Sequence, residues 1–149
     1  MFVQPSSLSR LLTLSFLLGV SSVSAGDPEQ VSVQTLFSPR VLSYQQHAVT
    51  VEGVIQNLQV FSPFDRTNGR SAPAKCLLYG RAAFLLEDET GIIPVEVLGT
   101  CHPHVVELLP RNEDHVRITG LVQVLKSEAP RHVRIQAMTI QILESIPQR

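Results

Sequence analysis

The sequence has no tryptophan, only two cysteines and a net charge of −1 over 149 residues. The near-neutral charge, with a pI of about 6.5, argues against a strongly basic protein that packages nucleic acid. Two cysteines are too few for a disulfide-dense miniprotein. Hydrophobic residues make up 44% and charged residues 17%, which is ordinary globular composition and argues against disorder or a collagen-like chain. The length fits one domain with short flanking segments.

The sequence also lacks an apolar run of the roughly 20 residues that a membrane-spanning helix needs. The N-terminal run from Leu11 to Val20 has about half that length, follows the single basic residue Arg10 and precedes small residues that end at Ala25. This pattern over residues 1–25 is typical of a secretory signal peptide that is cleaved after Ala25. No cysteine follows the run, so a lipoprotein signal is not indicated. We therefore expect a periplasmic or secreted protein without membrane insertion after cleavage.

The arrangements of residues that mark common enzyme classes are missing as well. There is no Gly-x-Ser-x-Gly nucleophile motif and no glycine-rich phosphate loop before a helix. The adjacent carboxylates of Glu87, Asp88 and Glu89 fall on a turn, where they would be solvated instead of paired across a cleft. We predict a non-enzymatic protein with no catalytic residue and no cofactor.

What the chain does contain, from Ala48 onward, is alternating apolar residues. Val49, Val51 and Ile55 alternate with polar residues at the period of two that is typical of a half-buried strand. Gly53 falls where a strongly bent strand would leave no room for a side chain. A change of phase after Ala137 predicts a bulge there. A long loop is expected over 62–75 and a short helix over about 103–109. The five expected strands cover about 48–55, 76–87, 92–98, 116–124 and 133–142.

The flanking segments are less regular. Residues 26–47 form a lead-in that Pro28 and Pro39 interrupt, and residues 144–149 form a tail. The apolar side chains of the lead-in are candidates for packing against the domain: Val31, Val33, Leu36 and Phe37.

The turn from Asp88 to Gly91 predicts the register of the central hairpin. If these two residues pair, all the apolar partners fall on one face: Ala82 with Val97, Phe84 with Val95, and Leu86 with Ile93. A shift by one residue would destroy this partition. Pro94 lacks an N–H, so the strand over 92–98 should have one poorly paired edge.

The two cysteines, Cys76 and Cys101, are expected to form a disulfide in an oxidising compartment, and two buried free thiols are the alternative. The hairpin register, extended outward, places them on the core face as diagonal neighbours about 7–8 Å apart. That separation is slightly more than the ~4.4–6.8 Å of most disulfides, so a twist or bulge would have to close the gap. Cys101 also begins the only ligand-like cluster, with His102 and His104. A closed metal site needs three or four ligands, so no metal site is predicted.

The order of strand, long loop, hairpin, short helix and two strands resembles the OB-fold (oligonucleotide/oligosaccharide-binding fold), a five-stranded barrel. Phe84–Val97 (FLLEDETGIIPVEV) resembles the leucine-x-Asp-x-Thr-Gly-x-Ile-x-Val hairpin of tRNA-anticodon-type OB domains. Val49–Ile55 and Val116–Val122 resemble their first and fourth strands. With its signal peptide, the chain also resembles small exported bacterial OB-fold proteins, from which its long first loop and two cysteines depart. The resemblance implies an all-β barrel over residues 48–143 with a binding role, and names no ligand.

In this fold, ligands lie across the second and third strands, between the first and last hairpin loops. Both loops carry an excess of basic residues here, although the whole chain does not. Phe61 and Phe64 lie beside the first loop and are available for stacking. The expected ligand is single-stranded nucleic acid or an anionic glycan. The predicted binding residues are Arg66, Arg70, Lys75, Tyr79, Arg81, Lys126, Arg131 and Arg134.

Two alternatives stay open, because the basic residues are equally typical of a solvated loop and the predicted outer face, with Glu96 and Pro94, is a poor stacking platform. The first is a protein-interaction module of the cell envelope that uses the strand edge near Pro94 or the lead-in. The second is a metal-handling protein that uses Cys101, His102 and His104.

Overall fold

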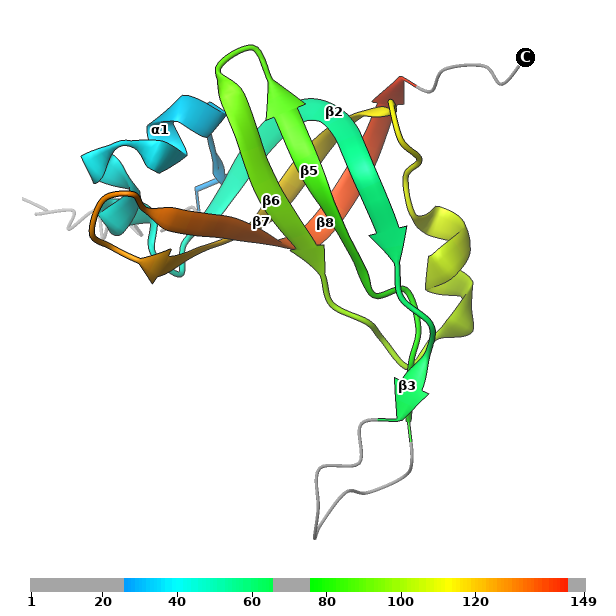
Figure 1. Ribbon diagram of the computed structural model, residues 1–149. Helices are drawn as coiled ribbons and strands as arrows, with labels where there is room; N and C mark the ends of the chain where they lie inside the picture. The colour runs from blue at the N-terminus through cyan, green and yellow to red at the C-terminus, as the bar shows by residue number, and fades with distance from the viewer. Residues whose placement is uncertain (1–25, 66–75, 145–149) are drawn as a thin grey trace, which may run out of the picture.

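Five strands close into a barrel in the computed structural model, which describes residues 26–65 and 76–144 (Figure 1). The barrel strands are β2 (Ala48–Val60), β5 (Ala82–Asp88), β6 (Gly91–Val97), β7 (His115–Lys126) and β8 (His132–Glu144). They pair in the order β2–β5–β6–β8–β7, and β7 pairs with β2 to close the sheet. The β6–β8 pairing is parallel, and the other pairings of the barrel are antiparallel. This five-stranded closed barrel is an OB fold, so the predicted fold class is confirmed.

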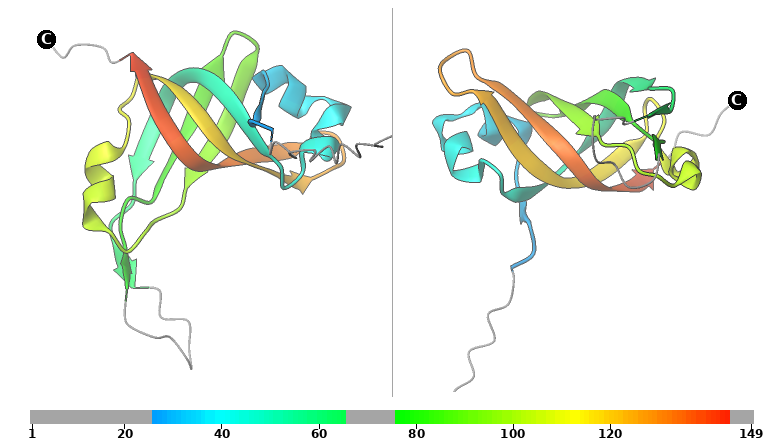
Figure 2. Two further views of the ribbon diagram at one scale, coloured as in Figure 1. Left: turned by 180° about the vertical axis from the view of Figure 1, so that it is seen from behind. Right: turned by 90° about the horizontal axis from the view of Figure 1, so that it is seen from below.

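A short helix separates the third and fourth strands of the barrel, where the sequence predicts one. η2 (Pro103–Leu108) is a 3-10 helix that begins with Pro103. Proline suits the first position of a helix, because the N–H there would have no hydrogen-bond partner within the helix. Figure 2 shows η2 at one end of the barrel and the lead-in at the other, with β7 and β8 on the side turned away in Figure 1. Within the described residues, no helix is long and apolar enough to cross a membrane.

The first strand of the barrel bends at the glycine that the sequence singles out. Val49, Val51 and Ile55 point inward and are fully buried. A Cβ on Gly53 would lie 2.5 Å from the backbone oxygen of Glu87. The next residue, Val54, is the point at which β2 changes partners from β7 to β5. Only glycine allows the strands to approach so closely at this bend.

The β5–β6 hairpin has the predicted register. Asp88 pairs with Gly91. Five of the six apolar partners are buried and Val97 is partly buried against the core. The pairs themselves are Ala82–Val97, Phe84–Val95 and Leu86–Ile93. The intervening residues therefore form the outer face of the hairpin.

The predicted bulge and open edge are also present. Thr119 pairs with Thr139 but Gly120 pairs with Ala137, so Met138 is the extra residue of a bulge in β8. β6 pairs with β8 only from Val95 to Val97, which leaves the edge at Pro94 without a strand partner. The helix α1 (Val33–Phe37) packs beside β6 instead. The strand edge that a protein partner was expected to use is therefore partly covered by the lead-in.

The lead-in is more ordered than its two prolines indicate. β1 (Glu29–Gln30) pairs in parallel with β2, and α1 is followed by the 3-10 helix η1 (Pro39–Tyr44). Val31, Val33 and Leu36 are buried, as predicted. Phe37 is 39% exposed, because Val33 and Leu36 occupy the buried face of this short helix and Phe37 lies at its rim.

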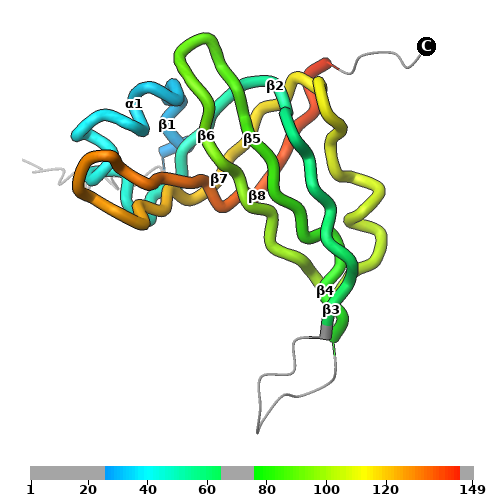
Figure 3. Tube along the Cα trace, viewed as in Figure 1, coloured from blue at the N-terminus to red at the C-terminus, as the bar shows by residue number. Residues whose placement is uncertain are grey.

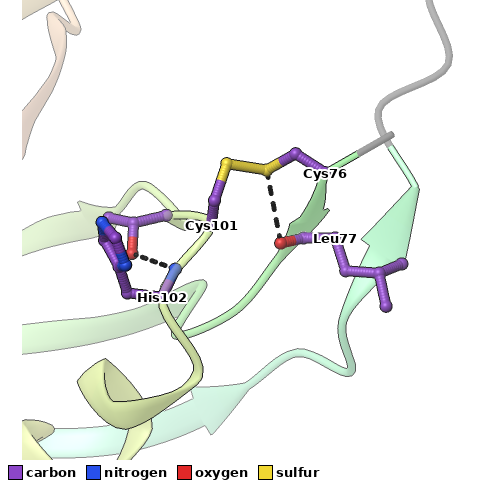
Figure 4. The surroundings of a disulfide bond; sticks show 5 residues. Cys76, Leu77, Cys101 and His102 are labelled. Atoms are coloured by element: carbon purple, nitrogen blue, oxygen red, sulfur yellow. Dashed lines mark hydrogen bonds between the residues drawn. A yellow bond between two sulfur atoms is a disulfide. The ribbon is translucent and has the colours of Figure 1, made fainter. Parts of the chain in front are cut away.

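Cys76 and Cys101 form the predicted disulfide, with their Cα atoms 5.6 Å apart (Figure 4). Their predicted place on the core face is wrong, since Cys101 is exposed and Cys76 is half-buried. The hairpin register continues outward only to the Tyr79–Thr100 bridge. Beyond it, β4 (Leu77–Leu78) leaves the barrel and pairs with β3 (Phe64–Asp65). Figure 3 shows this two-stranded ribbon projecting from the barrel, and the disulfide joins its outer end, at Cys76, to the segment before η2.

Candidate ligand-binding face

The outer face of β5, β6 and β8 carries a row of hydrogen-bonded and charged side chains. Pairing places Ala83 of β5 opposite Glu96 of β6, and Glu96 beside Gln136 of β8. At the β7–β8 pairing, Gln123 lies opposite Arg134. Three strands, β6, β7 and β8, thus bring polar side chains onto one side of the barrel, beside the β5–β6 face where OB folds bind their ligands.

Arg81 and two phenylalanines lie at the end of this row next to the β3–β4 ribbon. The guanidinium carbon of Arg81 lies 5.2 Å from the ring centroid of Phe61 and 4.9 Å from that of Phe64. Both distances fit cation–π contacts, which contribute about 0.5–2 kcal/mol each depending on exposure. Each phenylalanine is 40% exposed, so both rings keep part of their surface open to solvent. We call Phe61, Phe64 and Arg81 the aromatic–arginine cluster.

The backbone around Gly80 positions this cluster. Gly80 has a φ of 71°, and a Cβ there would lie 2.5 Å from Cγ2 of Val105. This left-handed conformation separates β4 from β5 and would be strained for any other residue. Tyr79 exchanges two backbone hydrogen bonds with Thr100, of 2.8 and 2.9 Å. On the other side, the N–H of Phe61 donates to the backbone oxygen of Arg81 at 2.9 Å.

Glu96 connects the cluster to the rest of the row. Arg134 Nη1 lies 2.8 Å from Glu96 Oε2, whereas Arg81 Nη2 lies 4.0 Å from Glu96 Oε1. Arg134 also donates from Nε to Gln123 Oε1 at 2.7 Å, and Gln123 donates from Nε2 to Gln136. Two guanidinium groups thus share one carboxylate, and the row as a whole is weakly positive. It offers hydrogen-bond donors and acceptors in fixed positions, with exposed aromatic rings at one end.

The structure brings together some of the predicted binding residues and leaves others apart. Arg81 and Arg134 meet through Glu96, and Tyr79 lies two residues from Arg81. Lys126 and Arg131 lie at the tip of the β7–β8 hairpin, which Figure 1 shows beside the lead-in, away from the β3–β4 ribbon. The remaining three, in the first loop, lie outside the described residues: Arg66, Arg70 and Lys75.

In the sequence, Glu96 counts against ligand binding, and Gln123 and Gln136 are not among the predicted binding residues. For Glu96, the hairpin register is the sequence signal that could have selected it, because the register places this residue on the outer face. Its contact with Arg134 follows from the parallel pairing of β6 with β8, which joins segments about 40 residues apart and has no local sequence pattern.

The histidine–cysteine cluster does not form a metal site in the described structure. Cys101 is bonded to Cys76, so its sulfur is not a thiolate ligand. His102 and His104 are exposed near the start of η2. Among the described residues, no group of three or more His, Cys, Asp or Glu side chains is arranged to hold a metal ion.

The turn end of the β5–β6 hairpin carries the opposite charge. An open groove of about 1200 Å³ lies there, lined by carboxylates and one histidine. Glu52 is paired with Arg117, while Glu87 and Glu89 are exposed. The acidic groove and the aromatic–arginine cluster therefore lie at opposite ends of one hairpin, and an anionic ligand is favoured only at the latter.

Comparison with known proteins identifies the fold and no family. No family model matches the chain, and no curated protein matches it. Among solved structures, it is similar to a protein described as an aspartyl-tRNA synthetase from Leishmania major Friedlin, with a TM-score of 0.53 and 13% identity. This match covers 85% of the chain but only 23% of the synthetase.

Two single-domain structures match over most of their own length. OBody AM3L09, solved bound to hen egg-white lysozyme, gives a TM-score of 0.52 and 19% identity over 80% of this chain and 100% of the OBody. The second OB-fold domain of replication protein A from Methanococcus maripaludis gives 0.48 and 18% over 70% of this chain and 91% of that domain. At these identities, the matches with TM-scores above 0.5 support the shared barrel and nothing further about the ligand.

Proposed function

We propose that this OB-fold chain is an exported, non-enzymatic binding protein that holds single-stranded nucleic acid on the outer face of β5, β6 and β8. The observation that carries the proposal is the aromatic–arginine cluster beside Glu96 and Arg134. Nucleic-acid bases stack on exposed aromatic rings and on guanidinium planes, and each stacked base is worth about 1–3 kcal/mol. A solvated, merely solubilising loop would not need two phenylalanines, each 40% exposed, around one arginine.

The same arrangement favours nucleic acid over an anionic glycan. Within the described row, one carboxylate offsets one of the two guanidinium groups, so the net charge there is small. A glycan held mainly through its carboxylates would need several unpaired cations. Stacking surfaces combined with paired hydrogen-bonding groups suit a ligand that presents flat bases with polar edges.

The export part of the proposal is supported by residues 1–25 and by the disulfide. Disulfides persist in oxidising compartments and are rare in the cytosol. Expression of the whole chain in a bacterial host, followed by N-terminal sequencing of the exported protein, should give a sequence that begins at Gly26. An uncleaved chain retained in the cytosol would contradict export.

Binding is tested by titrating a fluorescently labelled single-stranded oligonucleotide of mixed sequence, and separately an anionic polysaccharide, at low and moderate salt. We expect the oligonucleotide to bind, with an affinity that falls as salt rises, because binding releases the counterions that its phosphates hold. The double substitution Phe61→Ala/Phe64→Ala should weaken binding at least fivefold, which corresponds to the ~1 kcal/mol lower limit for one stacked base.

Phe37→Ala is the matched control, because Phe37 is 39% exposed but lies on α1, outside the proposed face. Its affinity should equal that of the wild type. Equal losses in both variants, or binding of the polysaccharide alone, would contradict the proposal.

A further inference from the structure

Glu96 is an unusual side chain for the centre of an anion-binding face. Its carboxylate is 25% exposed and lies between two guanidinium groups on the outer side of β6. A negative charge there repels phosphate, so this point of the face is poorly suited to the backbone of a nucleic acid. The ligand group that it accepts must instead present N–H donors.

The two oxygens of Glu96 have different surroundings. Oε2 is engaged by Arg134 at 2.8 Å. Oε1 lies 4.0 Å from Arg81, which is beyond hydrogen-bond distance. Within the described residues, Oε1 therefore keeps acceptor capacity, and the guanidinium donors of Arg81, which make no side-chain hydrogen bond there, lie next to it. Because Arg134 is itself held by Gln123, the carboxylate is fixed from the side of β8.

An acceptor beside donors matches a base edge that carries an amino donor next to a ring acceptor, as cytosine and adenine both do. Cytosine presents an exocyclic amino donor next to two acceptors, N3 and O2. Thymine and uracil present a carbonyl acceptor at the position of that amino group, and a carboxylate facing it would be repelled. Carboxylate side chains accept hydrogen bonds from the N4 amino group of cytosine in protein–DNA complexes.

We propose that Glu96 makes this face selective, so that it binds cytosine in preference to thymine or uracil. Glu96 accepts from the exocyclic amino group, Arg81 donates to the neighbouring ring acceptors, and Phe61 or Phe64 stacks on the base. This inference rests on the proposed binding of single-stranded nucleic acid, and it makes Glu96 the residue that determines specificity.

The test compares two ligands of equal length and charge, a single-stranded oligodeoxycytidylate and an oligothymidylate of about ten nucleotides, at slightly alkaline pH. The wild type should bind the cytosine oligomer at least about fivefold more tightly, since a well-formed base contact discriminates by about 1–3 kcal/mol. Glu96→Gln should bring the two affinities within about twofold of each other, because a glutamine amide can donate to the thymine carbonyl as well as accept.

Glu89→Gln is the matched control, since Glu89 is exposed at the hairpin turn, seven residues away and at the acidic end. It should keep the wild-type ratio. Each variant is measured with both ligands, so a general loss of stability does not alter the ratio. Equal affinities in the wild type would overturn the selectivity and leave the proposed function standing. A cytosine preference that survives in Glu96→Gln would overturn the role of Glu96, and failure of both oligomers to bind would overturn both proposals.

Discussion

At the scale of single residues, Asp88 shows that a residue of the family-like motif can have a structural role. Its Oδ1 accepts from the N–H and hydroxyl of Thr90, both at 2.7 Å, and from the N–H of Gly91 at 2.9 Å. Its Oδ2 accepts from the N–H of Val33 at 2.8 Å. Thr90 Oγ1 in turn accepts from the N–H of Gln34 at 3.0 Å. Asp88 and Thr90 therefore close the hairpin turn and hold the first turn of α1 to the barrel.

These contacts predict a pH dependence of stability. Burial raises the pKa of Asp88, but the hydrogen bonds from Thr90, Val33 and Gly91 outweigh it and hold the pKa below its ordinary value of 3.8. A carboxyl whose pKa is lower in the folded state stabilises the fold above its unfolded pKa, and this contribution is lost as the pH falls through the folded value.

Asp88→Asn should therefore lower the free energy of unfolding by about 1 kcal/mol at neutral pH, because the amide has one acceptor oxygen where the carboxylate uses two. The difference from the wild type should shrink as the pH falls below about 4. Urea unfolding of both proteins at neutral and acidic pH measures it. A difference that does not depend on pH would show that the charge of Asp88 contributes nothing.

At the scale of elements, the β5–β6 hairpin was predictable because all of its information is local. The turn residues and the alternation of apolar residues on both sides determine the register together. The lead-in was less predictable, since α1 has only five residues and is held by contacts with Asp88, 55 residues away from Val33. A helix of that length has no stable periodic pattern and depends on tertiary contacts.

The register predicts effects of very different size for two adjacent leucines of β5. Leu86 is fully buried in the barrel, whereas Leu85 lies on the outer face opposite Pro94. Leu86→Ala should lower the free energy of unfolding by about 2–5 kcal/mol, through lost burial and the cavity that it leaves. Leu85→Ala should cost less than about 1 kcal/mol. Chemical unfolding of both variants checks the pair, and the reverse order of effects would contradict the inward face assigned to Phe84, Leu86 and Val95.

At the scale of the whole molecule, the closed barrel presents the outer face of β5, β6 and β8, and the disulfide holds the β3–β4 ribbon beside it. The existence of the Cys76–Cys101 bond followed from the residue count and the expected compartment, but its place beyond the end of the barrel did not. The break at Gly80 is a backbone conformation that the apolar alternation does not encode. The contact of Glu96 with Arg81 and Arg134 likewise depends on strands that are distant in sequence. The two arginines could therefore be predicted from the sequence, but their shared contact with Glu96 could not.

The disulfide closes a loop between cysteines 25 residues apart. Loop-closure entropy predicts a contribution of about 3 kcal/mol to stability for a loop of this size. Cys76→Ser/Cys101→Ser should lower the free energy of unfolding by that amount while the barrel stays folded. A reductant should reproduce the loss in the wild type and leave the variant unchanged. Loss of the folded barrel on reduction would contradict the peripheral position of the bond.

The most direct test of the proposed binding face is a titration of the ¹⁵N-labelled protein with a single-stranded, cytosine-containing oligonucleotide, followed by NMR chemical-shift changes. We predict that the largest changes fall on the backbone amide signals of Phe61, Arg81, Glu96 and Arg134 and on the side-chain Nε signals of the two arginines, while the amides of Glu52 and His115 in the acidic groove do not respond. Changes confined to the groove or to the lead-in, or no changes at all, would contradict the assignment of this face as the ligand site.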